Sequence, residues 1–153
     1  MSERGENGVR YMEPKTILFV DDDEKILSSL EMTLEDEPVR CLYARSGAEA
    51  LVLLSQNKVH VIVTDMRMPD MSGLSLLKIV REKYPEVVRM VLSGYTQVTT
   101  LLAAINEGQI FKYITKPWRL EEEFIPSIRS ALEHYDRINS IQEGKADATD
   151  KDD

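Results

Sequence analysis

Residues 61–73 read VIVTDMRMPDMSG. A short apolar run bounded by turn residues is typical of a strand buried in a parallel sheet. Pro69 and Gly73 favour a turn that leads into the next helix. The segment therefore predicts a buried β-strand that ends on Asp65, followed by a loop and a helix.

Other apolar runs of the chain also end on polar residues. They are residues 17–20 before Asp21 and Asp22, residues 90–92 before Ser93, and residues 110–115 before Lys116. The carboxyl ends of parallel strands lie at one edge of a sheet, where the functional crevice of such folds is found. We therefore expect three carboxylates, a hydroxyl and an ammonium to meet in one pocket.

Strand-like and helix-like segments alternate along the chain, which predicts right-handed βαβ units. The fold class that follows is a three-layer α/β/α sandwich around a five-stranded parallel sheet. We expect strands at 16–21, 39–44, 59–64, 87–92 and 110–115, and helices at 23–36, 46–56, 72–84, 97–107 and 121–141. Pro126 favours a start of the last helix near Ile125. The expected organisation is a flexible leader over 1–14, one domain over 15–141, and a disordered acidic tail or truncated linker over 142–153.

Composition narrows the function classes. The chain has 153 residues, enough for one domain with a core, and a net charge of −8 without a basic stripe, which argues against direct nucleic-acid binding. No apolar stretch approaches the roughly 20 residues that a membrane span needs. Cys41 is the single cysteine, and together with the lack of an apolar leader this favours a cytoplasmic location.

The grouped polar residues suit phosphoryl chemistry. Carboxylates such as Asp21 and Asp22 are ligands for a hard cation such as Mg²⁺. A carboxylate such as Asp65 can act as a nucleophile on phosphorus. Ser93 could donate a hydrogen bond to a phosphoryl oxygen, and Lys116 could supply a positive charge. Each residue alone has a plainer interpretation, as an acidic helix start, a turn or a surface lysine.

Taken together, these residues resemble the receiver domain of bacterial two-component response regulators, of the chemotaxis-regulator-like kind. The resemblance runs from about Lys15 to Ile138. The strings that carry it are ILFVDDD at 17–23, VIVTDMRMPDMSG at 61–73, VLSG at 91–94 and YITKP at 113–117. The resemblance implies a flavodoxin-like fold with strand order 2-1-3-4-5.

The resemblance also implies residue roles. Asp65 would be the phosphoacceptor, and Mg²⁺ would be bound by Asp21, Asp22, Asp65 and the backbone carbonyl of Arg67. Ser93 and Lys116 would hold the phosphoryl oxygens. Two further roles are implied as well: a switch made of Ser93 and Tyr113, and tuning of the phosphoryl lifetime by Arg67 and Tyr95.

The implied partners are those of a signalling domain and not those of an enzyme. A histidine kinase or phosphotransfer protein would donate the phosphoryl group. An output domain or effector protein would read the surface of the fourth helix, fifth strand and fifth helix, or a homodimer would form through it. The apolar stripe that continues through Tyr135, Ile138 and Ile141 fits either a short coiled-coil linker or simple covering of the core.

Two other functions fit parts of the sequence. The Asp21-Asp22-Asp23 string also resembles the start of haloacid-dehalogenase-type phosphatases, with Asp21 as nucleophile and Asp23 as general acid. That alternative leaves Asp65 without a role. The other is a receiver-shaped interaction module that never accepts a phosphoryl group.

Overall fold

The computed structural model describes residues 3–4, 10–11, 13–94, 98–116 and 120–152, without the side chains of 3–4, 10–11, 93, 120–121 and 141–152. The strands are β1 (Glu3–Arg4), β2 (Arg10–Tyr11), β3 (Lys15–Val20), β4 (Val39–Ala44), β5 (Val61–Asp65), β6 (Val88–Ser93) and β7 (Lys112–Thr115). The helices are α1 (Glu24–Thr33), α2 (Gly47–Gln56), α3 (Gly73–Lys83), α4 (Val98–Asn106) and α5 (Ile125–Asp152). A π-helical turn, η2 (Leu120–Phe124), precedes α5.

The five strands from β3 onward form one parallel sheet, and β1 and β2 form a separate antiparallel pair. The order in the sheet is β4-β3-β5-β6-β7, which confirms the expected order 2-1-3-4-5. The register aligns the strand ends, since Val20 pairs with Thr64, Asp65 pairs with Leu92, and Ser93 pairs with Thr115. The polar residues that end the strands therefore share one side of the sheet, called here the carboxyl edge.

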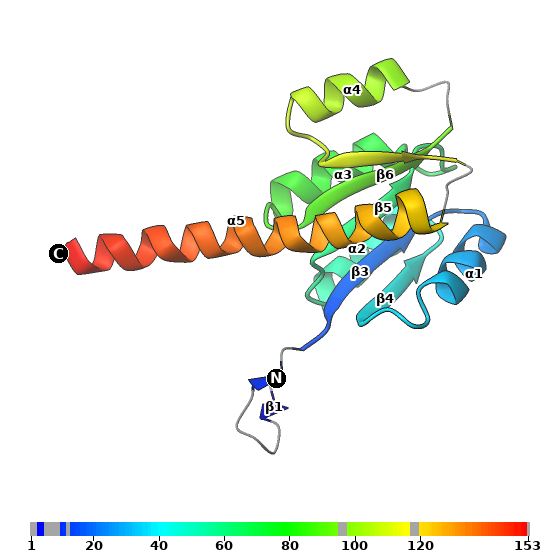
Figure 1. Cartoon of the computed structure of the whole chain (residues 1–153). Helices are drawn as coiled ribbons and strands as arrows, with labels where there is room; N and C mark the ends of the chain where they lie inside the picture. The colour runs from blue at the N-terminus through cyan, green and yellow to red at the C-terminus, as the bar shows by residue number, and fades with distance from the viewer. Residues whose placement is uncertain (1–2, 5–9, 12, 95–97, 117–119, 153) are drawn as a thin grey trace.

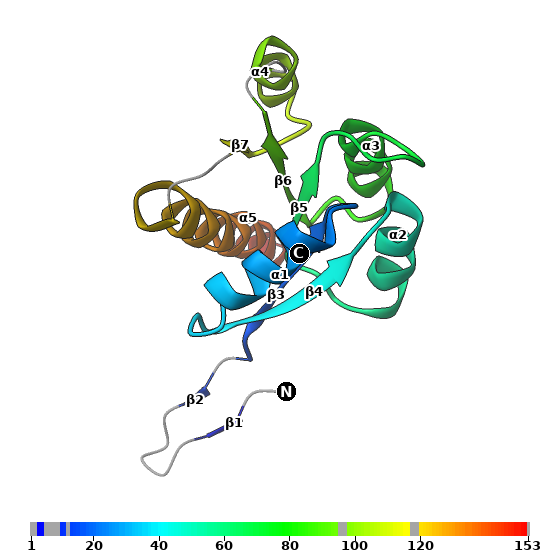
Figure 2. The same cartoon turned by 90° about the vertical axis from the view of Figure 1, so that its right-hand side faces the viewer.

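Helices cover both faces of the sheet and create two cores. Figure 2 shows α1 and α5 on one face, α2 and α3 on the other, and α4 beyond β6. Leu18, Ile62 and Val91 are buried toward α2, α3 and α4, whereas Phe19, Val63 and Met90 are buried toward α1 and α5. Burial on both faces explains why these strands are continuous apolar runs instead of alternating patterns.

The last helix begins at Ile125, as Pro126 indicated, and ends later than the sequence suggested. It begins at Ile125 with Pro126 in its first turn, where the missing N–H of proline costs no helical bond. It continues to Asp152, past the expected end near Ile141, and Figure 1 shows it projecting from the sheet. The boundaries of the domain and of its flanking segments stay a prediction. Within the described residues, no helix is both long and apolar enough to span a membrane.

An arginine of β6 fixes the carboxyl end of α4. The Arg89 guanidinium donates hydrogen bonds to the carbonyl oxygens of Gln109 (2.9 Å) and Val87 (2.9 Å). Gly108 follows the helix with a φ of 76°, in the left-handed region that favours glycine at helix ends. These contacts attach the α4–β7 loop to the sheet at the end opposite the carboxyl edge.

His60 links three elements at that same opposite end. Its Nδ1 accepts a hydrogen bond from the backbone N–H of Thr16 (3.0 Å), and its ring meets Tyr135 of α5 edge-on at 4.7 Å. The bond requires a neutral ring with the proton on Nε2. Burial lowers the pKa of His60 from its usual value, and the positive charges of Lys58 and Lys15 lower it further.

We predict that His60 makes the fold sensitive to mild acid. Because its folded pKa lies below the unfolded value of about 6.5, its stabilising effect is complete above that pH and is lost as the pH falls below it. Urea unfolding of the wild type and of His60→Gln at pH 7.5 and 5.5 tests this. The difference in unfolding free energy between them should shrink at pH 5.5, and a constant difference would contradict the prediction.

Candidate functional site

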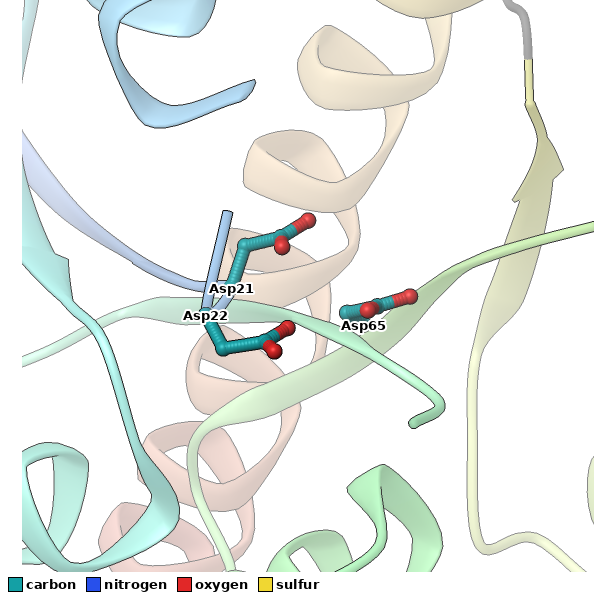
Figure 3. A group of neighbouring side chains, drawn as sticks. All are labelled: Asp21, Asp22 and Asp65. Carbon is teal, nitrogen blue, oxygen red and sulfur yellow. The ribbon is translucent and has the colours of Figure 1, made fainter. Parts of the chain in front are cut away.

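Three carboxylates meet at the carboxyl edge of the sheet. Asp21 and Asp22 directly follow β3, and Asp65 ends β5. One oxygen from each side chain lies within 4.8 Å of the others, and Figure 3 shows the three groups facing a common space. Asp21 is buried, Asp65 is half-buried and Asp22 is exposed, so the group opens to solvent on one side.

Lys116 supplies the counter-charge for this group. It directly follows β7, and its Nζ lies 3.1 Å from Oδ2 of Asp21 and 3.1 Å from Oδ1 of Asp65. One ammonium thus bridges two carboxylates that the chain separates by 44 residues. Charge-assisted bonds of this kind offset the repulsion between neighbouring carboxylates.

Asp21 and Lys116 shift each other's pKa. Burial raises the pKa of Asp21, and the opposing effects of the Asp23 N–H and of Lys116 only reduce that rise. Burial would lower the pKa of Lys116, but the charges of Asp65 and Asp21 outweigh it and leave that pKa raised. Lys116 is therefore a cation at neutral pH, held against the two carboxylates.

Asp23 follows the two site aspartates but has a structural role. Its carboxylate accepts a hydrogen bond from the N–H of Lys25 (2.9 Å) and caps the amino end of α1. Its own N–H donates to Oδ1 of Asp21 (2.9 Å), which fixes the orientation of that buried carboxylate. Asp23 is exposed and is not one of the three grouped carboxylates.

A glycine holds the backbone of Asp65 in place. The N–H of Gly73 donates to the carbonyl oxygen of Met66 (2.8 Å), and the N–H of Met66 donates to Oδ1 of Asp65 (2.9 Å). A Cβ on Gly73 would lie 2.1 Å from the carbonyl oxygen of Asp65. Only glycine lets the start of α3 approach the end of β5 this closely.

The other residues expected at the site divide into two groups. Arg67 is exposed in the loop after β5, and Tyr113 is half-buried on β7 against the core that α2, α3 and α4 cover. Ser93 ends β6 at the carboxyl edge, but its side chain, like Tyr95, lies outside the described residues. The structure therefore brings together the side chains of Asp21, Asp22, Asp65 and Lys116.

Sequence reasoning missed one residue beside the site. Asp70 lies in the loop after β5, and its carboxylate accepts hydrogen bonds from the backbone N–H groups of Gly47 and Ala48 at the start of α2. No local pattern could have revealed this contact, because 22 residues separate Asp70 from Ala48.

A parallel sheet of this order is the flavodoxin-like fold, and in this chain an acidic group lies at its carboxyl edge. The family model of the response regulator receiver domain matches residues 17–129. The chain belongs to this family, and its pocket of Asp21, Asp22 and Asp65 fits a phosphoacceptor site. The phosphatase alternative has no support, since Asp23 caps a helix and Asp65 lies within the group.

A transcriptional regulator is among the known proteins similar to this chain. The hydrogenase transcriptional regulatory protein HoxA of Cupriavidus necator is 44% identical over 118 residues, which are 77% of this chain and 24% of HoxA. The chain thus spans about a quarter of the length of that relative.

Solved receiver structures share the fold. The beryllofluoride-activated NtrC4 receiver domain dimer is 34% identical with a TM-score of 0.72, covering 78% of this chain and 98% of that one. The response regulator TrrA of Thermotoga maritima, in complex with Mg²⁺ and BeF, is 25% identical with a TM-score of 0.68, covering 77% of this chain and 99% of that one.

We predict that Gly73→Ala destabilises the fold and disturbs Asp65. The added Cβ meets a backbone oxygen that cannot move aside, and overpacking of this kind costs about 1–3 kcal/mol or more. Gly94→Ala is the matched control, because a Cβ there meets nothing within 4 Å. Thermal and urea unfolding should separate the two variants, and equal stabilities would refute the close approach described above.

Proposed function

We propose that this domain accepts a phosphoryl group on Asp65 from a phosphohistidine of a partner kinase or phosphotransfer protein. The observation that carries the proposal is the group of three carboxylates within 4.8 Å, with the Lys116 ammonium 3.1 Å from both Asp21 and Asp65. A half-buried carboxylate at the mouth of this pocket is open to an incoming phosphorus atom. Lys116 beside it supplies a positive charge, and Asp21 and Asp22 supply negative charges.

Mg²⁺ fits the donor set of the site. Asp21, Asp22 and Asp65 offer carboxylate oxygens, the ligands that this ion prefers, and the exposed side of Asp22 leaves room for the waters it keeps. We propose that these residues hold the ion together with the backbone carbonyl of Arg67. A bound Mg²⁺ neutralises charge on the transferring phosphoryl oxygens. The solved TrrA structure that resembles this chain contains Mg²⁺.

The transfer itself requires little covalent chemistry from the protein. A carboxylate oxygen of Asp65 forms a bond to phosphorus while the bond between phosphorus and the donor histidine nitrogen breaks, and that nitrogen keeps the electron pair. Lys116 pairs with the new phosphoryl oxygens, and the hydroxyl of Ser93 donates a hydrogen bond to them. Positioning and charge account for most of the catalysis in reactions of this kind.

We propose that the phosphoryl group then shifts a conformational equilibrium. Ser93 moves toward the phosphoryl group, and Tyr113 follows on β7, which changes the surface of α4, β7 and α5. A near-complete switch requires about 5.5 kcal/mol of differential stabilisation. Arg89 holds the carboxyl end of α4 on the sheet, so the movement falls on its amino end, which follows Ser93. Arg67 and Tyr95 tune how long the phosphoryl group survives.

The surface of α4, β7 and α5 is the proposed readout. An output domain, an effector protein or a second copy of the domain would bind it. The similarity to HoxA, a transcriptional regulator, supports an output at the level of transcription. The similarity to an activated NtrC4 receiver dimer supports self-association. Signalling of this kind belongs in the cytoplasm, where kinase and phosphodonors are found.

We predict that Asp65→Asn abolishes covalent labelling. Wild-type protein incubated with acetyl phosphate and Mg²⁺ should gain one phosphoryl group, and mass spectrometry should locate it on Asp65. Asp21→Asn is the informative comparison, because it retains the acceptor and should label at the same residue, only more slowly. Labelling of Asp21, or no Mg²⁺-dependent labelling at all, would instead favour a phosphatase or a pure interaction module.

We also predict that Mg²⁺ stabilises the fold through the same carboxylates. A ligand bound only by the folded state at 100 times its Kd adds about 2.7 kcal/mol to the unfolding free energy. Urea unfolding with and without Mg²⁺ should show this gain in the wild type. Asp22→Asn should reduce it, because Asp22 is an exposed member of the group with no part in the core. Equal gains in both proteins would place the ion elsewhere.

A further inference from the structure

Asp70 links the acidic site to α2, a helix that supplies none of the three grouped carboxylates. Asp70 lies in the loop of residues 66–72 between β5 and α3, called here the 66–72 loop. Its Oδ1 accepts a hydrogen bond from the N–H of Gly47 (3.3 Å), and its Oδ2 accepts one from the N–H of Ala48 (3.0 Å). Both N–H groups belong to the first turn of α2, which lies on the same face of the sheet as α3 (Figure 2).

These two N–H groups need a partner from outside the helix. The first four N–H groups of a helix have no acceptor within it. Ser46, the local cap of α2, accepts from Glu49 (3.1 Å), which leaves the N–H groups of Gly47 and Ala48 to other acceptors. The carboxylate of Asp70 accepts from both and places its negative charge at the positive end of the helix. The same bonds lower the pKa of Asp70, foremost that from Ala48, so it is ionised at neutral pH.

Side-chain packing also holds the 66–72 loop against the start of α2. Met71 follows Asp70, and a Cβ on Gly47 would lie 2.6 Å from Cγ and Sδ of Met71. The methionine side chain therefore occupies space that exists because residue 47 is a glycine. A hydrogen-bonded carboxylate and an interlocked side chain thus attach the far end of the 66–72 loop to α2.

The near end of the loop is attached to the site itself. Met66 is buried, its N–H donates to Asp65, and its carbonyl oxygen accepts from Gly73 (2.8 Å). Arg67 lies between the two attachments, and its side chain is exposed. Within the described part of the chain, that side chain makes no hydrogen bond that would hold it in place. Met68, next to Arg67, packs against the core that α2, α3 and α4 cover. The position of the Arg67 backbone therefore depends on this packing and on how firmly the two ends of the loop are held.

We infer that Asp70 is a positioning residue that holds the 66–72 loop against α2, so that the Arg67 carbonyl stays in place beside Asp65. The inference rests on the proposed function, in which that carbonyl binds Mg²⁺. Asp70 contacts neither the ion nor the phosphoryl group and acts only through the loop. Loss of the two hydrogen bonds loosens the far end of the loop, and the ion then binds a ligand set that it must first order. Partners that orient metal ligands typically change affinity by about 10–100-fold.

The experiment compares three variants of the whole chain. Asp70→Ala removes both acceptors, Asp70→Asn keeps one neutral oxygen for capping, and Ser46→Ala removes the other cap of the same helix. Ser46 is the matched control, because its side chain caps α2 through the N–H of Glu49, a residue of the helix itself. Calorimetric titration with Mg²⁺ alone gives the affinity of each protein. Amide hydrogen exchange without Mg²⁺ reports the loop independently of the ion.

We expect Asp70→Ala to weaken Mg²⁺ binding by about tenfold, Asp70→Asn to restore much of the loss, and Ser46→Ala to bind as the wild type does. Without Mg²⁺, amides of residues 66–71 should exchange faster in Asp70→Ala than in Ser46→Ala. Unchanged affinity in Asp70→Ala, or equal weakening in Ser46→Ala, would overturn the inference and leave the proposed function standing. A wild type that binds no Mg²⁺ would overturn both.

Discussion

The Lys116 ammonium between Asp21 and Asp65 is the contact on which the site depends. Three carboxylates within 4.8 Å repel one another, and Asp21 is buried as well. A cation from a third strand offsets that repulsion at 3.1 Å from each of two carboxylates. The sheet can bring these groups together only because β3, β5 and β7 run parallel and end at the same edge. The acidic group therefore requires this sheet topology.

Contacts hold the backbone around Asp65 in place as well as its side chain. Gly73 approaches the Asp65 carbonyl where no other residue fits, and Asp70 attaches the intervening loop to α2. The carboxyl end of α4, by contrast, is attached by Arg89 at the opposite side of the sheet. The fold thus places the acidic group beside a helix whose following loop is attached to the sheet. This is a suitable arrangement for converting a local change of charge into a change of surface.

The sequence was sufficient to predict those parts of the structure that follow from local patterns of residues. Apolar runs that end on Asp21, Asp65 and Lys116 predicted both the parallel sheet and the pocket, because side chains at the ends of parallel strands must converge. Contacts between distant segments carry no such signature. The cap that Asp70 provides to α2 joins residues 22 positions apart, and the packing of Met71 against Gly47 depends on the final fold. Pro126 indicated the start of α5 at Ile125, but no periodicity revealed the π-helical turn before it.

The central claim is that Asp21, Asp22 and Asp65 jointly hold a divalent cation beside a phosphoryl group on Asp65. A crystal structure of this domain grown with Mg²⁺ and beryllofluoride, a stable mimic of the phosphoryl group, tests it most directly. We expect beryllium bonded to an Asp65 oxygen, Mg²⁺ in contact with the carboxylates of Asp21, Asp22 and Asp65, and Lys116 moved onto a fluorine. A pocket in which beryllofluoride is attached to another residue, or in which Mg²⁺ lies away from these carboxylates, would contradict it.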